Sequence, residues 1–87
     1  MKSQTTIDFW ACYAGLPREV KRTPVRAYRL WRENPRHPGL HFKCVNVDAA
    51  VYAVRIGIHW RALGIVDGDT VTWFWIGSHA DYDRLLS

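Results

Sequence analysis

The stretch VTWFWIGSHADYD, residues 71–83, carries the strongest structural signal in the chain. Its first six residues, 71–76, are almost all apolar, so an extended backbone presents apolar side chains on both faces, which is typical of a strand inside a sheet. Ser78 is followed three residues later by Asp81, as in a capping box, and the helix that begins there is expected to run to Leu86. The stretch therefore predicts an internal strand that leads into a short C-terminal helix.

Three segments upstream have the two-residue period of strands. Apolar residues alternate with polar or small ones over residues 40–44, 52–56 and 60–64. Residues 67–69, Asp-Gly-Asp, are a strong signal for a hairpin turn before the last strand. Together these segments predict a four-stranded, mainly antiparallel, twisted sheet.

The N-terminal third of the chain has a helical pattern. Residues 7–13 predict a short helix capped by Thr5 or Thr6, and residues 17–33 predict a longer one with a single apolar face. Pro24 removes a backbone hydrogen bond inside the longer helix, which predicts a kink or two abutting helices. The expected fold class is α+β, with two N-terminal helices, the second kinked near Pro24, packed on the sheet.

Length and composition set limits on the function. A chain of 87 residues predicts a single domain spanning residues 1–87, and 48% apolar residues exclude a disordered protein. Cys12 and Cys44 lie too far apart for a CxxC motif. His37 and His41 have the spacing of a helical metal-binding pair, but the Pro-Gly of residues 38–39 breaks the helix that such a pair would need. We expect no metal and no cofactor.

The charge distribution indicates the partner. Residues 1–44 carry nine Lys and Arg against three Asp and Glu, within a net charge of +4 for the whole chain. This imbalance favours a nucleic acid or an acidic protein segment as the partner. The N-terminus lacks the apolar core of a signal peptide and no run is long enough to span a membrane, so a cytoplasmic protein without membrane contact is expected.

Arginines of the longer helix form a basic stripe opposite its apolar face. Arg18, Arg22 and Arg29 are the candidates there for binding an RNA backbone. An acidic peptide would suit the same stripe, and a purely solvated helix face is the simpler alternative.

A second set of residues suits chemistry on RNA. Lys43, Arg55 and Arg61 alternate outward on neighbouring predicted strands, and His79 and Tyr82 follow the last strand on one side of the terminal helix. Cleavage of RNA without a metal needs a group that takes the 2′-OH proton, cations that hold the phosphate, and an acid for the 5′ oxygen. Taken singly, the cations could merely solubilise the sheet, His79 could bond to backbone, and Tyr82 could be a core-edge aromatic.

The tryptophans of the last strand offer one more contact. Trp73 and Trp75 are core residues by default, although either could reach the open face of the sheet and stack a base.

These residues together resemble a known family, the RelE/ParE superfamily of bacterial type II toxins. The similarity covers residues 9–86 and is greatest to a small branch whose members end in WFWIGxHxxYD, as residues 73–83 do here. Supporting segments are Tyr52-x-Val-Arg55 and the Arg-Ala-Leu-Gly of residues 61–64. The resemblance implies the α+β fold described above and a cognate antitoxin whose acidic or amphipathic segment wraps the toxin.

The resemblance also implies roles for single residues. Arg61 matches the phosphate-binding arginine of the family's third strand, and Arg55 lies where one of two strand lysines occurs in RelE-type members. His79 lies where nuclease members have His or Arg, and Tyr82 lies near the family's final aromatic. The other strand lysine is replaced by Ala53, a departure for which Lys43 is a possible substitute.

The implied activities differ between branches. RelE-like members cut mRNA, often on the ribosome, whereas ParE-like members inhibit DNA gyrase without nuclease residues. The first expectation is a metal-independent endoribonuclease that cleaves mRNA and inhibits translation, with Arg55, Arg61, His79 and Tyr82 as catalytic residues and Lys43 in RNA binding. The alternatives are a non-catalytic gyrase inhibitor and an inactive toxin-derived binding domain.

Overall fold

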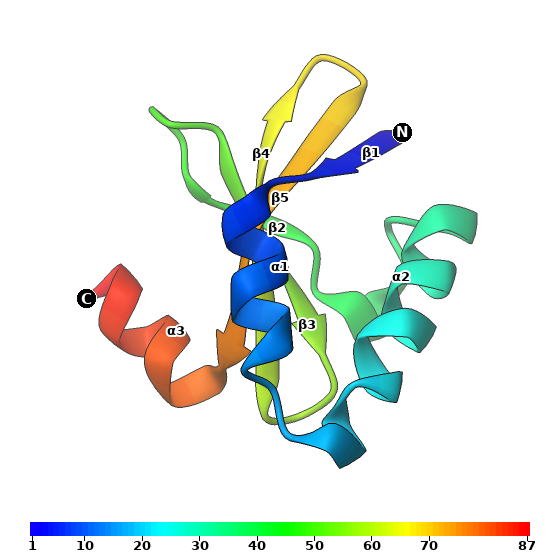
Figure 1. Ribbon diagram of the computed structural model, residues 1–87. Coiled ribbons are helices and arrows are strands. Elements are labelled where there is room, and N and C mark those ends of the chain that lie inside the picture. The colour runs from blue at the N-terminus through cyan, green and yellow to red at the C-terminus, as the bar shows by residue number, and fades with distance from the viewer.

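The computed structural model describes residues 1–87 as one five-stranded sheet with helices on both faces (Figure 1). The strand order is β1-β5-β4-β3-β2. The strands and helices follow the chain as β1 (Lys2–Thr5), α1 (Ile7–Ala14), α2 (Arg22–Glu33), β2 (Lys43–Asn46), β3 (Val51–Ile56), β4 (Trp60–Asp67), β5 (Thr70–Ser78) and α3 (His79–Leu86). This confirms the α+β class and the terminal strand-to-helix unit.

The sheet has one strand more than the sequence predicts. β1 pairs in parallel with β5, with Thr5 opposite Trp73, whereas all other neighbours are antiparallel. β1 was missed because its four residues, Lys-Ser-Gln-Thr, carry no large apolar side chain. Its backbone pairing with β5, rather than a buried face, makes it a strand.

The expected kink at Pro24 is wrong, whereas the alternative of two abutting helices describes the segment, with the break at Lys21. A 3₁₀ turn, η1, occupies Arg18–Val20, and α2 begins only at Arg22. Pro24 is thus the third residue of the helix, where a backbone N–H has no partner within the helix, so proline costs no hydrogen bond there. A similar shift affects β2, which begins at Lys43 because Pro38–Leu40 forms another 3₁₀ turn, η2.

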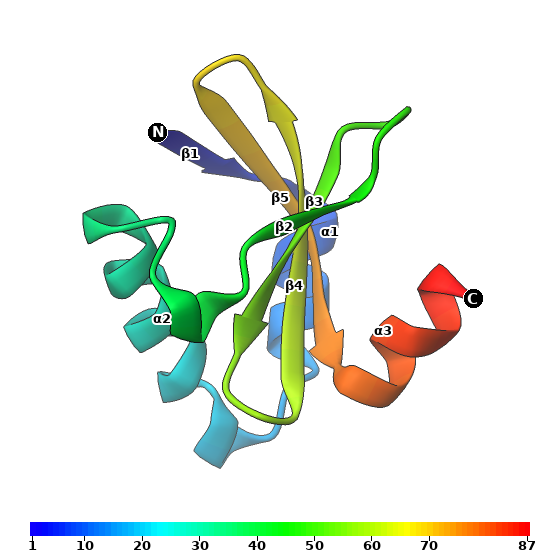
Figure 2. The same ribbon diagram turned by 180° about the vertical axis from the view of Figure 1, so that it is seen from behind.

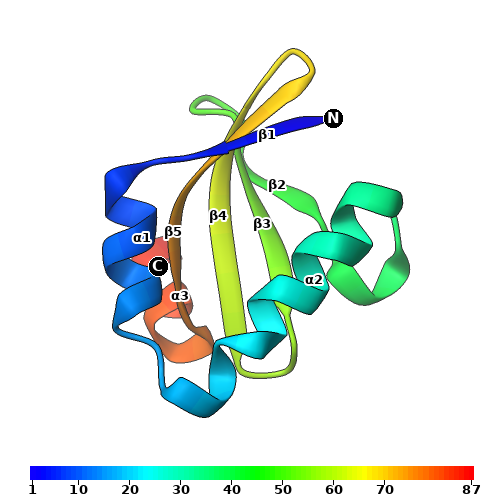
Figure 3. The same ribbon diagram turned by 45° about the vertical axis from the view of Figure 1, so that its right-hand side comes forward.

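The helices divide the protein into layers. Figure 3 shows α1 and α2 in front of the sheet and α3 behind it. The main core lies on the α1 and α2 face, where Trp31, exposed by only 1%, packs edge-on against Trp73. On the other face, Tyr82 of α3 packs in a smaller cluster with Ala53 and Leu63. None of the helices has the length and hydrophobicity needed to cross a lipid bilayer.

Candidate active site

Two arginines face each other on the neighbouring strands β3 and β4, next to the turn that joins them. Arg55 of β3 and Arg61 of β4 are direct partners in the antiparallel register, so both side chains emerge on the face that carries α3. Both are half-buried, and neither forms an ion pair with a carboxylate. Like charges placed directly opposite one another destabilise a sheet. Their arrangement is therefore suited to an anion held between them.

The turn between β3 and β4 fixes both guanidinium groups. Nη1 of Arg61 donates to the carbonyl oxygens of Gly57 at 3.1 Å and Trp60 at 2.8 Å, and Nε of Arg55 donates to Gly57 at 3.4 Å. Gly57 has a φ of +71°, a backbone conformation that glycine adopts without strain. These bonds occupy only some of the five donors of each arginine. The remaining donors are available to a phosphate.

The same turn holds the start of α3. The backbone N–H of His79 donates to the carbonyl oxygen of His59 at 2.7 Å, and Figure 2 shows the β3–β4 turn and the first residue of α3 at one end of the molecule. Ser78 caps the helix, its hydroxyl accepting from the N–H of Asp81 at 3.1 Å. This confirms Ser78 as the predicted start of the helix, although the carboxylate of Asp81 pairs with Arg84 and does not complete a capping box. His79 thus lies at the edge of the face that carries the arginines.

The side chains of α3 complete the group. Nε2 of His79 lies 3.4 Å from Oδ1 of Asp83, one helical turn later, and the rings of His79 and Tyr82 have centroids 6.0 Å apart. The Tyr82 ring is buried against the sheet, whereas the His79 side chain is 48% exposed. An accessible imidazole thus lies beside a carboxylate and a buried phenol.

The electrostatics of this group are coupled. Burial raises the pKa of Tyr82, opposed by the charge of Arg61 and reinforced by Asp83. Burial also lowers the pKa of Arg61, and the neighbouring charge of Arg55 acts in the same direction. At neutral pH, Tyr82 is consequently a protonated phenol that can donate a hydrogen bond, and Arg61 remains a cation.

The structure thus brings Arg55, Arg61, His79 and Tyr82 together, and we define these four as the cation cluster. Lys43 lies on the same face at its border. It pairs with Ala53 on the edge strand β2, diagonal to Arg55, and its side chain is exposed. A lysine side chain is long enough to approach a phosphate chain that extends from the cluster.

Two residues of this region were not predicted. Asp83 is detectable from its i, i+4 spacing to His79, because such pairs are neighbours on a helix. His59 is detectable only from the register, since Trp60 pairs with Ser78 and so places the turn beside α3. Asp83 lies beside the His79 side chain, and the carbonyl oxygen of His59 accepts from the backbone N–H of His79.

The two tryptophans of β5 lie on opposite faces of the sheet. Trp73 is buried in the main core, with only 5% of its surface exposed. Trp75 lies on the cluster face, since it pairs with Leu63, and its ring covers Gly77, the direct partner of Arg61. A Cβ at Gly77 would lie 2.5 Å from that ring, so the indole needs a glycine there. Trp75 is therefore the aromatic surface next to the cluster.

Arg18, Arg22 and Arg29 are not part of this site. Together with Lys21 and Arg26 they border a separate groove on η1 and α2, on the opposite face of the sheet from α3. A nucleotide held between Arg55 and Arg61 does not reach them. Their assignment to RNA binding stays a prediction.

Solved structures of similar fold are toxins and toxin complexes. The chain is similar to a chain of the RelB–RelE antitoxin–toxin complex from Methanococcus jannaschii, with a TM-score of 0.73 at 13% identity over 97% of this chain and 99% of that one. It is similar to a chain of the RelBE2 toxin–antitoxin complex from Mycobacterium tuberculosis, with a TM-score of 0.70 at 18% identity over 90% and 96%. The YoeB/ParE toxin from Agrobacterium tumefaciens gives a TM-score of 0.68 at 18% identity over 91% and 99%. At such identities these likenesses show the fold.

Family membership follows from the sequence itself. No curated protein sequence matches the chain. The family model for the ParE-like toxin domain, however, matches residues 21–84, a span that runs from α2 to α3 and includes the whole cation cluster. The chain therefore belongs to the family of ParE-like toxin domains and is a toxin of the RelE/ParE type from a toxin–antitoxin system.

Proposed function

We propose that this toxin is a metal-independent endoribonuclease that cleaves mRNA in the cytoplasm and thereby inhibits translation. One observation carries the proposal: Arg55 and Arg61 face each other without any carboxylate partner, next to the turn that also holds the start of α3 at His79. A pair of guanidinium groups fixed in this way matches the oxygens of a phosphodiester.

The geometry supports an internal displacement at phosphorus. His79 accepts the proton of the 2′-OH, and the 2′ oxygen attacks the phosphorus while the bond to the 5′ oxygen breaks. Arg55 and Arg61 neutralise the negative charge that grows on the phosphate oxygens. A proton delivered to the 5′ oxygen, by His79 in its other protonation state or through water, leaves a 2′,3′-cyclic phosphate and a free 5′-OH.

Three further residues support binding and positioning. Asp83 holds one nitrogen of His79, which leaves the other free for the substrate. Tyr82 is a protonated phenol at neutral pH, and burial raises its pKa further; it orients His79 or donates a hydrogen bond to the substrate. Trp75 stacks a base next to the scissile phosphate, and Lys43 contacts a neighbouring phosphate in place of the lysine that Ala53 replaces.

The test is RNA cleavage by the purified toxin with a chelator present, and primer extension after cell-free translation. The wild type is expected to produce new RNA ends, and the double variant His79→Ala with Arg61→Ala none. Identical RNA patterns for the two proteins would refute the nuclease. Running both assays also shows whether cleavage needs the ribosome.

The match to the ParE-like toxin domain favours a second candidate, a toxin that binds and inhibits DNA gyrase. In that case the protein would inhibit supercoiling of plasmid DNA without cleaving RNA. No proton transfer by His79 would then be needed, and inhibition of supercoiling would occur without any new RNA ends. In both cases we propose a cognate antitoxin with an acidic segment as the neutralising partner.

A further inference from the structure

The turn that joins β3 to β4 brings a second histidine to the cation cluster. In the antiparallel ladder of β4 and β5, Arg61 pairs with Gly77. Two residues further along, the same register places His59 opposite His79, and the backbone N–H of His79 donates to the carbonyl oxygen of His59 at 2.7 Å. The Cα atoms of an antiparallel pair joined by such a bond lie about 5.5 Å apart. Two histidines are therefore neighbours at this end of the sheet.

Both histidine side chains start on the face that carries the arginines. Trp60 begins β4, and Ser78 has an extended backbone with a φ of −70° and a ψ of 156°. Side chains two positions apart on an extended backbone lie on the same face. His59 therefore starts on the face of Arg61, and His79 starts beside it. His59 is exposed and forms no ion pair within the chain.

The guanidinium of Arg61 is tied to the turn on both sides of His59. Its Nη1 donates to the carbonyl oxygens of Ile58 at 3.3 Å and Trp60 at 2.8 Å, and these two residues are the chain neighbours of His59. The arginine has further donors that can hold a phosphate. A phosphate bound to them would lie beside the His59 side chain.

Cleavage of RNA needs two proton transfers on opposite sides of the phosphate. In an in-line displacement the attacking 2′ oxygen and the leaving 5′ oxygen lie on opposite sides of phosphorus. The first oxygen loses a proton and the second gains one, so a base and an acid that come from different elements suit the reaction. His79 on α3 and His59 on the turn meet this requirement.

The surroundings of the two imidazoles assign their roles. Nε2 of His79 lies 3.4 Å from Oδ1 of Asp83, so the carboxylate accepts the Nε2–H and leaves the lone pair on Nδ1. A carboxylate that holds an imidazole in this way is typical of a general base. His59 has no carboxylate partner, and its imidazolium form has N–H groups to donate.

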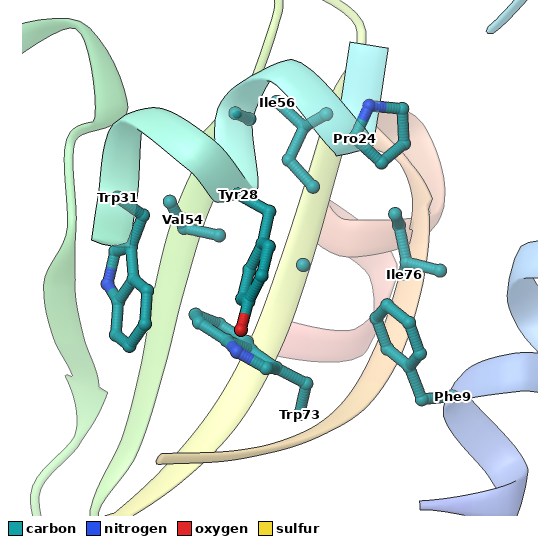
Figure 4. A pocket seen from close by; sticks show the side chains of 10 residues that line it. Phe9, Pro24, Tyr28, Trp31, Val54, Ile56, Trp73 and Ile76 are labelled. Carbon is teal, nitrogen blue, oxygen red and sulfur yellow. The ribbon is translucent and has the colours of Figure 1, made fainter. Parts of the chain in front are cut away.

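The opposite face of the sheet has no such pair of imidazoles. The cleft between α1 and α2, with a volume of about 370 Å³, and a smaller cavity of about 50 Å³ beside it are lined without histidine. Figure 4 shows Phe9, Trp73 and other apolar side chains around the smaller cavity. The two remaining histidines, His37 and His41, flank η2. The paired imidazoles therefore lie only where the two arginines lie.

We propose that His59 is the general acid of RNA cleavage and His79 the general base, a proposal that rests on the proposed nuclease. The 2′ oxygen forms a bond to phosphorus as its proton passes to Nδ1 of His79. The bond from phosphorus to the 5′ oxygen breaks, and its electron pair takes a proton from the His59 imidazolium. The products are a 2′,3′-cyclic phosphate and a 5′-OH. One imidazole has gained a proton and the other has lost one, and exchange with water restores both.

The experiment compares two RNA oligonucleotides that differ at one linkage. The first has the natural linkage, and in the second sulfur replaces the 5′ oxygen that leaves. A thiol is far more acidic than an alcohol, so the sulfur leaves as a thiolate without a proton. Single-turnover cleavage of both RNAs by the full toxin is measured with the RNA free and with the RNA bound to the ribosome as mRNA.

A general acid affects the two linkages differently. His59→Ala should slow cleavage of the natural linkage by about 10²-fold, and cleavage of the sulfur linkage should stay within about threefold of the wild-type rate. His79→Ala should slow both by a similar factor, because the 2′-OH loses its proton in both. Equal loss at the two linkages in His59→Ala, or no loss at either, would overturn the inference.

Two further variants separate proton transfer from structure. Substitution of His59 keeps the backbone carbonyl that holds α3, and circular dichroism checks that each variant is folded. His59→Gln keeps a hydrogen-bonding side chain that transfers no proton and should behave like His59→Ala. Ile58→Ala, at a residue that is 67% exposed in the same turn, should cleave both linkages as the wild type does. A wild-type rate on the natural linkage in His59→Gln would overturn the assignment.

Failure of this inference and failure of the proposed nuclease give different results. A wild type that cleaves both linkages, with His59→Ala equally slow on both, would refute only the role of His59. A wild type that cleaves neither linkage, free or on the ribosome, would refute the nuclease and this inference with it.

Discussion

The two faces of the sheet carry basic residues of different kinds. On the α3 face, Arg55 and Arg61 are half-buried and their guanidinium groups are tied to the carbonyl oxygens of one turn. On the α1 and α2 face, Arg22 and Arg26 are exposed on a helix, next to unpartnered apolar surface. Fixed donors suit the changing charge of a reacting phosphate, whereas mobile cations beside an apolar cleft suit a protein segment. The position and surroundings of a basic residue therefore say more about its binding partner than the net charge of +4 does.

Among these substitutions, Arg61→Ala is expected to slow RNA cleavage most, and so to distinguish the two faces of the sheet most clearly. Loss of one preorganised donor to the phosphate should slow RNA cleavage by about 10²- to 10³-fold. The free energy of unfolding should not fall by a comparable amount, because removing Arg61 also removes its repulsion of Arg55. Single-turnover cleavage and urea denaturation measure the two effects. Arg26→Ala is the control on the other face, and equal loss of activity there would erase the distinction.

His79→Ala is expected to slow cleavage by about 10²-fold, as the loss of a general acid or base does. The wild-type rate should depend on pH, because the proposed mechanism needs proton transfer by His79, and the residual rate of the variant should lose that dependence. A variant with the pH profile of the wild type would assign the proton transfer to another group, and His59 is the nearest alternative in the fold.

Much of this architecture is readable in the sequence, but its details are not. The strand alternation in residues 52–56 and 60–64 predicts that Arg55 and Arg61 share a face, and the capping pattern at Ser78 predicts α3. The register, however, depends on the length of the β3–β4 turn, so the direct pairing of the arginines is visible only in the structure. β1 is held by backbone pairing and by hydrogen bonds of Ser3 and Gln4 to β5, and it leaves no apolar pattern in the sequence.

Pro24 shows a second reason why the sequence alone does not predict every detail of the fold. A proline in the first turn of a helix and a proline in its interior look alike when the start of the helix is unknown. The cleft between α1 and α2 is likewise invisible in the sequence, because the same apolar residues would line a closed helix pair.

A smaller effect is expected from Asp83→Asn. The His79–Asp83 pair is solvent-exposed, with 48% and 64% of the two side chains accessible, so its contribution to orienting the imidazole is modest. Cleavage should slow by about fivefold, because the amide no longer offers the imidazole a charged partner. Asp81→Asn, on the same helix, is the control because Asp81 pairs with Arg84 instead.

Tyr82 links the cluster to stability at high pH. Burial raises the pKa of its phenol above the ordinary value of 10.0, so the folded state favours the protonated form more than the unfolded state does. Its contribution to stability is fully present below about pH 10 and is lost as the pH rises through the folded pKa. Urea denaturation between about pH 8 and 11 should therefore show a steeper loss for wild type than for Tyr82→Phe. Parallel curves would contradict the buried phenol.

The smallest effect on chemistry is expected from Val25→Glu. Because Val25 lies in the cleft on the far face of the sheet, cleavage of a short RNA should stay within about twofold of wild type. A large loss of cleavage without unfolding would show that the two faces act as one site.

The claim that the unpaired arginines of the α3 face bind a phosphodiester has a direct test. A cleavage-resistant oligonucleotide with 2′-O-methyl groups is titrated into isotope-labelled toxin and followed by NMR through backbone and side-chain signals. The largest shifts are expected at Arg55, Arg61, His79 and the indole of Trp75, with little change at Arg22 and Arg26. Shifts confined to Arg22 and Arg26, with the cation cluster unaffected, would contradict the account.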